Sequence, residues 1–301
     1  MSSAIEAQQP AAQPIASPAQ RRGASPNWLR SLRSRRLRPA IVPAAILVLV
    51  VLSAVFAPWI APYDPDALDM SMALGDPNAT NWLGTDQLGR DQLSRLLYGG
   101  RATLLVSGVS TFGIVVIGLV VGLVAGYFGG RTDLLISTLL TVLLALPSLL
   151  LSLAILGILG PGNESLLIAL VAAGWAGHAR IFRASVLSLR EQVYIEAAVS
   201  LGGQSTRILF RHLLPNLLPT VIVLATLDFG ALLLTVSSLS FLGLGVQPPT
   251  SDWGVMLNDA RTYFSQVPML MIVPGVCIAA VALSSNLLGD ALRDMIDAGH
   301  R

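Results

Sequence analysis

Residues 180–216 read RIFRASVLSLREQVYIEAAVSLGGQSTRILFRHLLPN, an arginine-rich stretch between two hydrophobic segments. Ser188 and Glu191 form a Ser-x-x-Glu pattern, which predicts a helix start because the two side chains cap free backbone N–H groups. Gly202 and Gly203 predict its end, since glycine is favoured just past a helix terminus. The stretch therefore predicts a short helix over about 188–203, held outside the apolar segments.

This predicted helix has one apolar face, formed by residues four apart: Leu189, Val193, Ala197 and Leu201. Residues at this spacing lie on the same side of a helix. Such a face outside the bilayer suits docking onto another subunit, and the small pair Ala197-Ala198 would let a partner approach closely. A helix that packs within its own loop has the same pattern, so both interpretations stand at this point.

The composition is that of a membrane protein. Hydrophobic residues make up 53% of the 301 residues and charged residues 12%, whereas a soluble protein carries about 25% charged residues. All 19 basic residues are arginine. A Walker A motif requires a lysine on the nucleotide phosphates, so the chain cannot be an ATPase itself. The three histidines lack metal-ligand spacing and Cys277 is the single cysteine, so neither a metal, a cofactor nor an intrachain disulfide is expected.

Six apolar segments have roughly 20 residues each, the length that crosses the hydrocarbon core of a bilayer. They cover 41–61, the stretches bracketed by Arg101 and Arg131 and by Asp133 and Glu164, about 165–182, about 217–244, and the stretch between Arg261 and Asp290. With both termini in the cytoplasm, 15 arginines lie inside and four outside, as the positive-inside rule requires. The prediction is an all-α integral membrane protein with six transmembrane helices and cytoplasmic N and C termini.

Three regions follow from this map. Residues 1–39 are expected to form a disordered cytoplasmic tail with a short interfacial basic helix. Residues 40–101 are expected to hold the first transmembrane helix and an extracytoplasmic loop, in which a short helix starts at Asp91 and ends at Gly99-Gly100. Residues 102–301 would form a five-helix core that includes the predicted helix at about 188–203.

Two features within the predicted spans indicate close packing or function. Gly118, Gly122, Gly126 and Gly130 are each four residues apart, a spacing that lets two transmembrane helices approach closely. The alternative is that Gly126 and Gly130 only end the helix. Asp228 is the one acid deep in a span, and such a group faces a partner or a wet cavity. It is a candidate for lining a translocation path and equally for a structural acid.

The 180–216 stretch also resembles a known family motif. Glu196-Ala197-Ala198, three residues, Gly202, nine residues and then His212-x-Leu214-Pro215 is similar to the EAA loop of ABC importer permeases. The broad family favours an aliphatic residue at the position of His212, whereas His-x-Leu-Pro-Asn is typical of the peptide-importer branch. Three further blocks resemble that branch, at 82–95, at 240–249 with Trp253-Gly254, and at 289–294.

The resemblance implies a C-type permease subunit of a dipeptide/oligopeptide ABC importer with the type I permease fold, in the bacterial inner membrane. It implies that Glu196, Ala197, Ala198, Gly202, His212, Leu214 and Pro215 couple the chain to an ATPase. The implied partners are a second homologous permease, two cytoplasmic ATPase subunits, an extracytoplasmic binding protein and a peptide substrate, with no nucleic acid. The chain would then not be an enzyme.

Three other functions are weighed against this one. A permease of the same family for nickel or another small solute has the same motifs. An ion-coupled secondary transporter would use midplane ionisable groups, for which Asp228 is the one candidate. A polytopic membrane enzyme finds no support, since the chain has no His-Glu-x-x-His motif.

Overall fold

The computed structural model describes residues 38–299, and all regular structure in that range is helical apart from one isolated bridge between Thr85 and Asp91. The helices are α2 (Arg38–Val55), α3 (Ala57–Ile60), η2 (Met70–Met72), α4 (Gln92–Phe128), α5 (Gly130–Leu144), α6 (Ser148–Leu159), α7 (Asn163–Arg190), α8 (Val193–Ser200), α9 (Ser205–Ile208), η3 (Leu209–Leu213), α10 (Leu214–Phe241), α11 (Trp253–Ala260), η4 (Arg261–Tyr263) and α12 (Met269–Gly299). The all-α prediction is confirmed. The predicted tail lies outside the described residues, except for Arg38 and Pro39 at the start of α2.

Four helical stretches between residues 38 and 299 are long and apolar enough to cross a membrane: α4, α7, Ser205–Phe241 and α12. The pair α5 and α6 would make a fifth if it counts as one span, but its two halves meet at an angle of 84°. The third predicted span therefore corresponds to two helices with a sharp bend between them. Pro147 lies at the break with an extended backbone, because proline lacks the N–H that would continue the helical hydrogen bonds. α2 is a shorter apolar helix.

α4 joins the predicted short helix after Asp91 and the predicted second span into one helix. Asp91 caps its first turn, accepting a hydrogen bond from Ser94 N, and the helix then runs unbroken for 37 residues. The start at Asp91 is confirmed, but the predicted end at Gly99-Gly100 was wrong. A Cβ at Gly100 would lie 2.8 Å from the Trp253 ring. These glycines therefore make room for α11 rather than ending a helix.

The glycine ridge of α4 packs against α7. A Cβ at Gly118, Gly122 or Gly126 would meet the Cβ of His178, Phe182 or Val186, respectively, at 2.5–2.7 Å. Close packing is thus confirmed for three of the four glycines, while Gly130 has a φ of 55° beyond the helix end and no neighbour within 4 Å among the described residues. The numbers of the contacting residues increase in the same direction along both helices, so α4 and α7 run parallel. The bent pair α5–α6 leads the chain back from the end of α4 to the start of α7.

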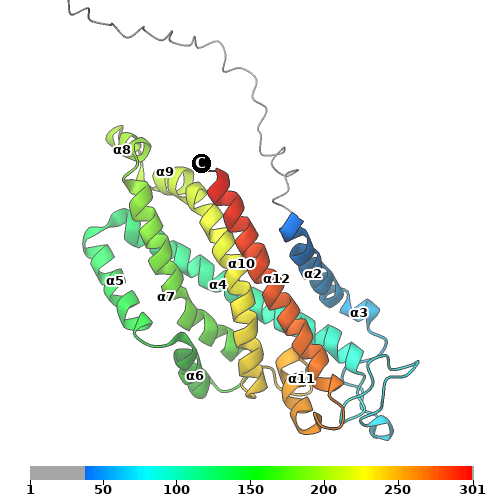
Figure 1. The fold of residues 1–301 in the computed structure, drawn as a ribbon. Helices are drawn as coiled ribbons and strands as arrows, with labels where there is room; N and C mark the ends of the chain where they lie inside the picture. The colour runs from blue at the N-terminus through cyan, green and yellow to red at the C-terminus, as the bar shows by residue number, and fades with distance from the viewer. Residues whose placement is uncertain (1–37, 300–301) are drawn as a thin grey trace, which may run out of the picture. The chain divides into compact units, whose positions relative to one another are not determined.

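α10 and α12 form the other half of the bundle. Gly230 lies against Ala282 and Gly289 against Leu227, so the two helices run antiparallel. A cluster that contains Leu233, Trp253, Met256, Ile278 and Val281 joins α10, α11 and α12. Leu47 and Val50 of α2 also pack on it. Figure 1 shows α8 and α9 at one end of the bundle and α11 at the other.

Candidate functional site

The predicted coupling helix is shorter than the sequence indicated. α7 continues through Ser188 to Arg190, Glu191 is its C-cap, and α8 begins only at Val193. The start predicted at Ser188 was wrong because buried Phe182 and Val186 extend the apolar face of α7 beyond the bilayer segment. Gln192 has an extended backbone and caps α8 without a side-chain hydrogen bond. The capping-box pattern therefore does not operate here.

The predicted end of the helix is confirmed. Gly203 N donates to Ala198 O, Gly202 N donates to Val199 O, and Gly202 has a φ of 77°, as in a helix terminated by a left-handed residue. Gly203, which was not among the predicted coupling residues, is the tighter of the two positions. A Cβ there would lie 2.7 Å from Ala198 O, whereas one at Gly202 meets no described atom within 4 Å.

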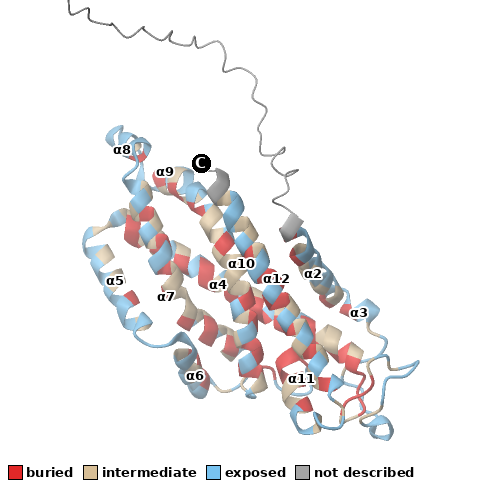
Figure 2. Ribbon diagram, in the orientation of Figure 1, coloured by how far each residue is buried: buried red, intermediate tan, exposed pale blue. Residues whose placement is uncertain are grey.

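α8 exposes most of the predicted apolar face. Val193 is 80% exposed and Leu201 88% exposed, and Ala197 between them is exposed as well. Glu196 is exposed beside this face and Ala198 is half-buried. Figure 2 shows α8 as a largely exposed helix at its end of the bundle. Large exposed apolar side chains that are free of the chain's own packing are typical of a surface that binds another protein or a membrane.

One side chain anchors α8 to the rest of the chain. Ile195 is fully buried in a cluster with Val186 of α7, Ile208 of α9, Leu213 of η3 and Leu217 of α10. The helix is thus held on one side by this cluster while its opposite side stays open. The burial of Ile195 and Leu213 was not predicted. It could have been inferred from the sequence, because these apolar residues alternate with positions that are exposed.

The second half of the motif lies directly behind α8. His212 is half-buried in the π-helical turn η3, its ring centroid 6.4 Å from that of Tyr194. Asn216 Nδ2 donates to Tyr194 Oη at 3.3 Å and to His212 O at 2.6 Å. Pro215 is exposed and lies in the first turn of α10, where its missing N–H costs nothing, and Leu214 is half-buried. The two halves of the motif therefore meet in space.

Asp228 pairs with His178 in the middle of the bundle. The two side chains join α10 to α7 through His178 Nε2 and Asp228 Oδ2, and the Asp228 side chain is 30% exposed. A polar pair satisfies both groups in an apolar span. The pairing explains how the apolar helix α7 carries His178. Spacing could not reveal it, because the partners lie 50 residues apart.

A second ion pair ties α7 to α5. Arg183 Nη2 donates to Asp133 Oδ2 at 2.6 Å. Arg190 Nη1 then donates to the Tyr127 carbonyl at the end of α4 at 3.0 Å. α7 is therefore connected by polar contacts to α4, α5 and α10, and it leads directly into α8. A displacement of α8 would act first on α7.

The opposite end of the bundle carries a buried ionic network. Arg95 is 2% exposed and binds Asp86, Asp259 at 3.1 Å and Ser251 Oγ at 2.9 Å. Arg90 also binds Asp86, at 2.7 Å. The network fastens the loop before α4 onto α11. Two of the sequence blocks that carry the family resemblance, at 82–95 and near 253, thus lie side by side.

Asp252 lies beside this network and is almost fully buried. Its Oδ1 caps α11 by accepting from Val255 N at 2.7 Å, while its Oδ2 has no hydrogen-bond partner within residues 38–299. Burial raises the pKa of the Asp252 carboxyl above its ordinary value of 3.8.

Comparison with known families bears on these sites directly. Residues 118–301 match the family described as binding-protein-dependent transport system inner membrane component. The chain belongs to this family. Residues 28–79 additionally match the N-terminal TM domain of oligopeptide transport permease C. The protein is therefore a permease subunit of an ABC importer, a multi-pass membrane protein of a transport system rather than an enzyme.

The permease has relatives with several named substrates. It is 41% identical over 268 residues to the dipeptide transport system permease protein DppC of Alkalihalophilus pseudofirmus, covering 89% of this chain and 88% of the relative. It is 42% identical to the di/tripeptide transport system permease protein DppC of Pseudomonas aeruginosa, covering 83% and 85%. It is 40% identical to the nickel transport system permease protein NikC of Escherichia coli K12, covering 87% and 93%.

A solved structure supports the fold of the permease. A chain of the MetNI methionine ABC transporter, in inward-facing conformations, superposes with a TM-score of 0.55 and 21% identity. The match covers 66% of the permease and 95% of that chain. The type I importer permease fold is thereby supported.

Between residues 38 and 299, no three His, Cys, Asp or Glu side chains come together in a way that could hold a metal ion. The described residues present a helix with an exposed apolar face, a partly buried polar pair, and a loop before α4 that an ionic network fastens to α11.

Proposed function

We propose that this permease imports di- or oligopeptides and that α8 couples it to a cytoplasmic ATPase. One observation carries the coupling: the apolar face of Val193, Ala197 and Leu201 is exposed on a helix that Ile195 anchors to α7, α9 and α10. Burying such side chains against a partner is favourable by about 1.5–3 kcal/mol each. In the folded chain the side chains of Val193 and Leu201 remain exposed, so this free energy of burial is available to a binding partner.

In this proposal the permease forms half of the translocation path, with a second homologous permease forming the other half. Two ATPase subunits would dock on the EAA loop, which comprises Glu196, Ala197, Ala198, Gly202, His212, Leu214 and Pro215. An extracytoplasmic binding protein would deliver the peptide. Closure of the ATPases would move α8, and α7 would carry the displacement to the Asp228–His178 pair in the centre of the bundle.

The role of Asp228 follows from its partner. The pair with His178 supports a structural role as a link between α7 and α10. The 30% exposure of Asp228 also allows the carboxylate to reach a path between the two permease subunits. The proposal therefore places Asp228 at the wall of the path, held in position by His178.

The orientation is proposed from the arginine distribution: six spans with both termini in the cytoplasm of a bacterium and the permease in its inner membrane. A reporter fused after Asp76 or after Thr250 should behave as extracytoplasmic, and one fused after Ser200 as cytoplasmic. A cytoplasmic signal at Asp76 would overturn this orientation.

The coupling proposal is tested with a charge placed in the exposed apolar face. Ala197→Arg should abolish copurification of the ATPases and transport, while the protein remains in the membrane. Ala73→Arg is the matched control, since Ala73 is equally exposed but lies in the loop at the opposite end of the bundle. Wild-type ATPase copurification with Ala197→Arg would reject α8 as the docking helix.

Peptides are proposed as substrates because relatives named for dipeptides and di/tripeptides are 41–42% identical to the permease. Deleting the gene in a strain without redundant importers should abolish uptake of a labelled dipeptide. Loss of nickel uptake with full dipeptide uptake would instead assign the permease to nickel. Uptake that survives ATP depletion but stops when the ion gradient collapses would replace the ABC mechanism by an ion-coupled one.

A further inference from the structure

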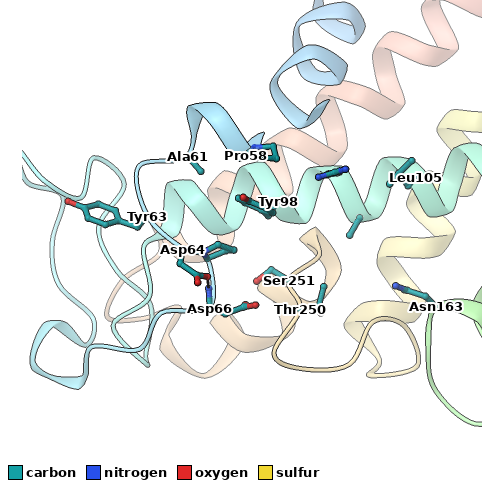
Figure 3. A pocket seen from close by; sticks show the side chains of 13 residues that line it. Pro58, Ala61, Tyr63, Asp64, Asp66, Tyr98, Leu105, Asn163, Thr250 and Ser251 are labelled. Carbon is teal, nitrogen blue, oxygen red and sulfur yellow. Dashed lines mark hydrogen bonds between the residues drawn. The ribbon is translucent and has the colours of Figure 1, made fainter. Parts of the chain in front are cut away.

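A cavity of about 700 Å³ opens beside the first turns of α4, at the end of the bundle opposite α8. Its walls come from five segments: α3, the loop that follows it, α4, the start of α7 and the loop before α11. Figure 3 shows side chains from each of these segments around the opening, including Asp64, Tyr98, Asn163 and Ser251. Small-molecule sites have volumes of about 300–1,000 Å³, so the size suits a small solute.

The charged residues that line this cavity carry both signs. Asp64 and Asp66 lie on its loop wall and Arg101 on its α4 wall. All three residues are exposed, and none of their side chains takes part in an ion pair within residues 38–299. The cavity therefore offers separate anionic and cationic groups to a ligand.

The wall that carries the two acids is fixed. Asp64 Oδ1 accepts a hydrogen bond from Asp66 N at 2.9 Å, and Tyr63 N donates to Ser94 Oγ of α4 at 3.2 Å. On the other side, Ser251 is buried and its Oγ accepts from Arg95 Nε of the ionic network. A binding group that is held in place before the ligand arrives loses less entropy on binding.

We propose that this cavity binds a short zwitterionic peptide on the extracytoplasmic side of the permease. Asp64 and Asp66 accept hydrogen bonds from the terminal ammonium group, and Arg101 donates to the terminal carboxylate, with which a guanidinium pairs in fixed geometry. Tyr98 and Leu105 supply apolar surface for the side chains between the two termini. This inference rests on the proposed peptide function and makes the permease itself a contributor to substrate selection.

A divalent cation fits this cavity less well than a peptide. Nickel prefers imidazole or several oxygen ligands in regular geometry, whereas here a guanidinium shares the cavity with the two carboxylates. The arrangement matches a ligand that carries one positive and one negative end. The chemistry of the cavity therefore favours the peptide among the substrates that the relatives are named for.

The test uses the complete permease–ATPase complex in lipid nanodiscs without the binding protein. Binding of Ala-Ala, of N-acetyl-Ala-Ala and of Ala-Ala amide is measured by saturation-transfer NMR. Ala-Ala should bind the wild-type complex, and the double variant Asp64→Asn/Asp66→Asn and the variant Arg101→Gln should each weaken it at least about tenfold, as expected for a lost charged hydrogen bond. N-acetylation and amidation of the peptide should weaken binding to the wild type similarly.

Matched controls are Asp76→Asn and Arg261→Gln, which remove an exposed acid and an exposed arginine at the same end of the bundle but outside the cavity. Both should bind Ala-Ala like the wild type. Equal binding by the wild type and the cavity variants, or no binding at all, would overturn the inference. Weaker docking of the binding protein with unchanged Ala-Ala binding would also overturn it and mark the cavity as a docking surface.

Uptake of Ala-Ala into proteoliposomes that contain the binding protein separates this inference from the proposed function. If the wild type takes up Ala-Ala but the cavity does not bind it, the site is wrong and the peptide function stands. If the wild type takes up no peptide, the proposed function fails, and the cavity loses its ligand with it.

Discussion

Replacing Val193 and Leu201 together by alanine should detach the ATPase without unfolding the permease. Leu201→Ala removes three carbon groups and Val193→Ala two, at about 0.8 kcal/mol for each group that becomes buried. Because the residues are 88% and 80% exposed, nearly all of this energy is available to a partner. The double variant should therefore lose up to about 3.4 kcal/mol of binding free energy, or roughly 300-fold in Kd.

The assay measures binding of the purified ATPase to the permease pair in nanodiscs, together with the melting temperature of each variant. Ile195→Ala is the informative comparison, since Ile195 is fully buried and its truncation should cost about 2–5 kcal/mol of unfolding free energy. Leu68→Ala, in the exposed loop of the opposite end, should change neither quantity. Wild-type ATPase affinity in the Val193/Leu201 double variant, or a loss of melting temperature as large as that of Ile195→Ala, would refute the reasoning.

Three further predictions concern buried polar groups. His178→Leu should lower uptake and melting temperature more than Asp228→Asn, because it leaves a carboxylate without its hydrogen-bond partner in an apolar span. The double variant should recover part of the loss, and strictly additive effects would count against the pair. Arg95→Gln should lower the unfolding free energy by about 3–5 kcal/mol because it removes one partner of a buried ion pair, whereas replacing exposed Arg261 by glutamine should change it by no more than about 0.5 kcal/mol. Equal melting temperatures of the two variants would show that the ionic network around Arg95 does not stabilise the fold. Burial raises the pKa of Asp252 in the folded state, so the stability that this group contributes is lost as the pH rises from about 4 through the raised value, where the unfolded chain has released the proton and the folded protein still holds it. Asp252→Asn keeps the cap at Val255 but cannot titrate, so the melting temperature of the wild type minus that of the variant should fall over this pH window. A constant difference would show that Asp252 does not titrate there.

Local features of the sequence were enough for several elements. The lengths of the apolar segments predicted the helical class, and Asp91 and Gly202 correctly marked a helix start and a helix end. These are properties of a few neighbouring residues, whose side chains cap or interrupt backbone hydrogen bonds. The four-residue spacing of Val193, Ala197 and Leu201 likewise predicted a common face before any neighbour was known.

Other local signals were overridden by packing. The Ser188 pattern is a good helix start, but α7 passes through it because the buried face of Phe182 and Val186 continues to its end. Gly99-Gly100 is a good helix end, but α4 passes through it because the glycines receive Trp253. In both places the tertiary contacts outweigh a capping preference of about 1 kcal/mol.

The sequence by itself determined which segments are apolar, where α4 begins and α8 ends, and which face of α8 is apolar, since each depends on residues a few positions apart. Only the tertiary structure decided which groups meet. Asp228 finds His178 50 residues away, and Arg95 finds Asp259 164 residues away. Spacing along the chain carries no record of such contacts, because helix packing and the bend at Pro147 bring them together. Helix packing likewise brings the exposed residues Asp64, Asp66 and Arg101 to the wall of one cavity.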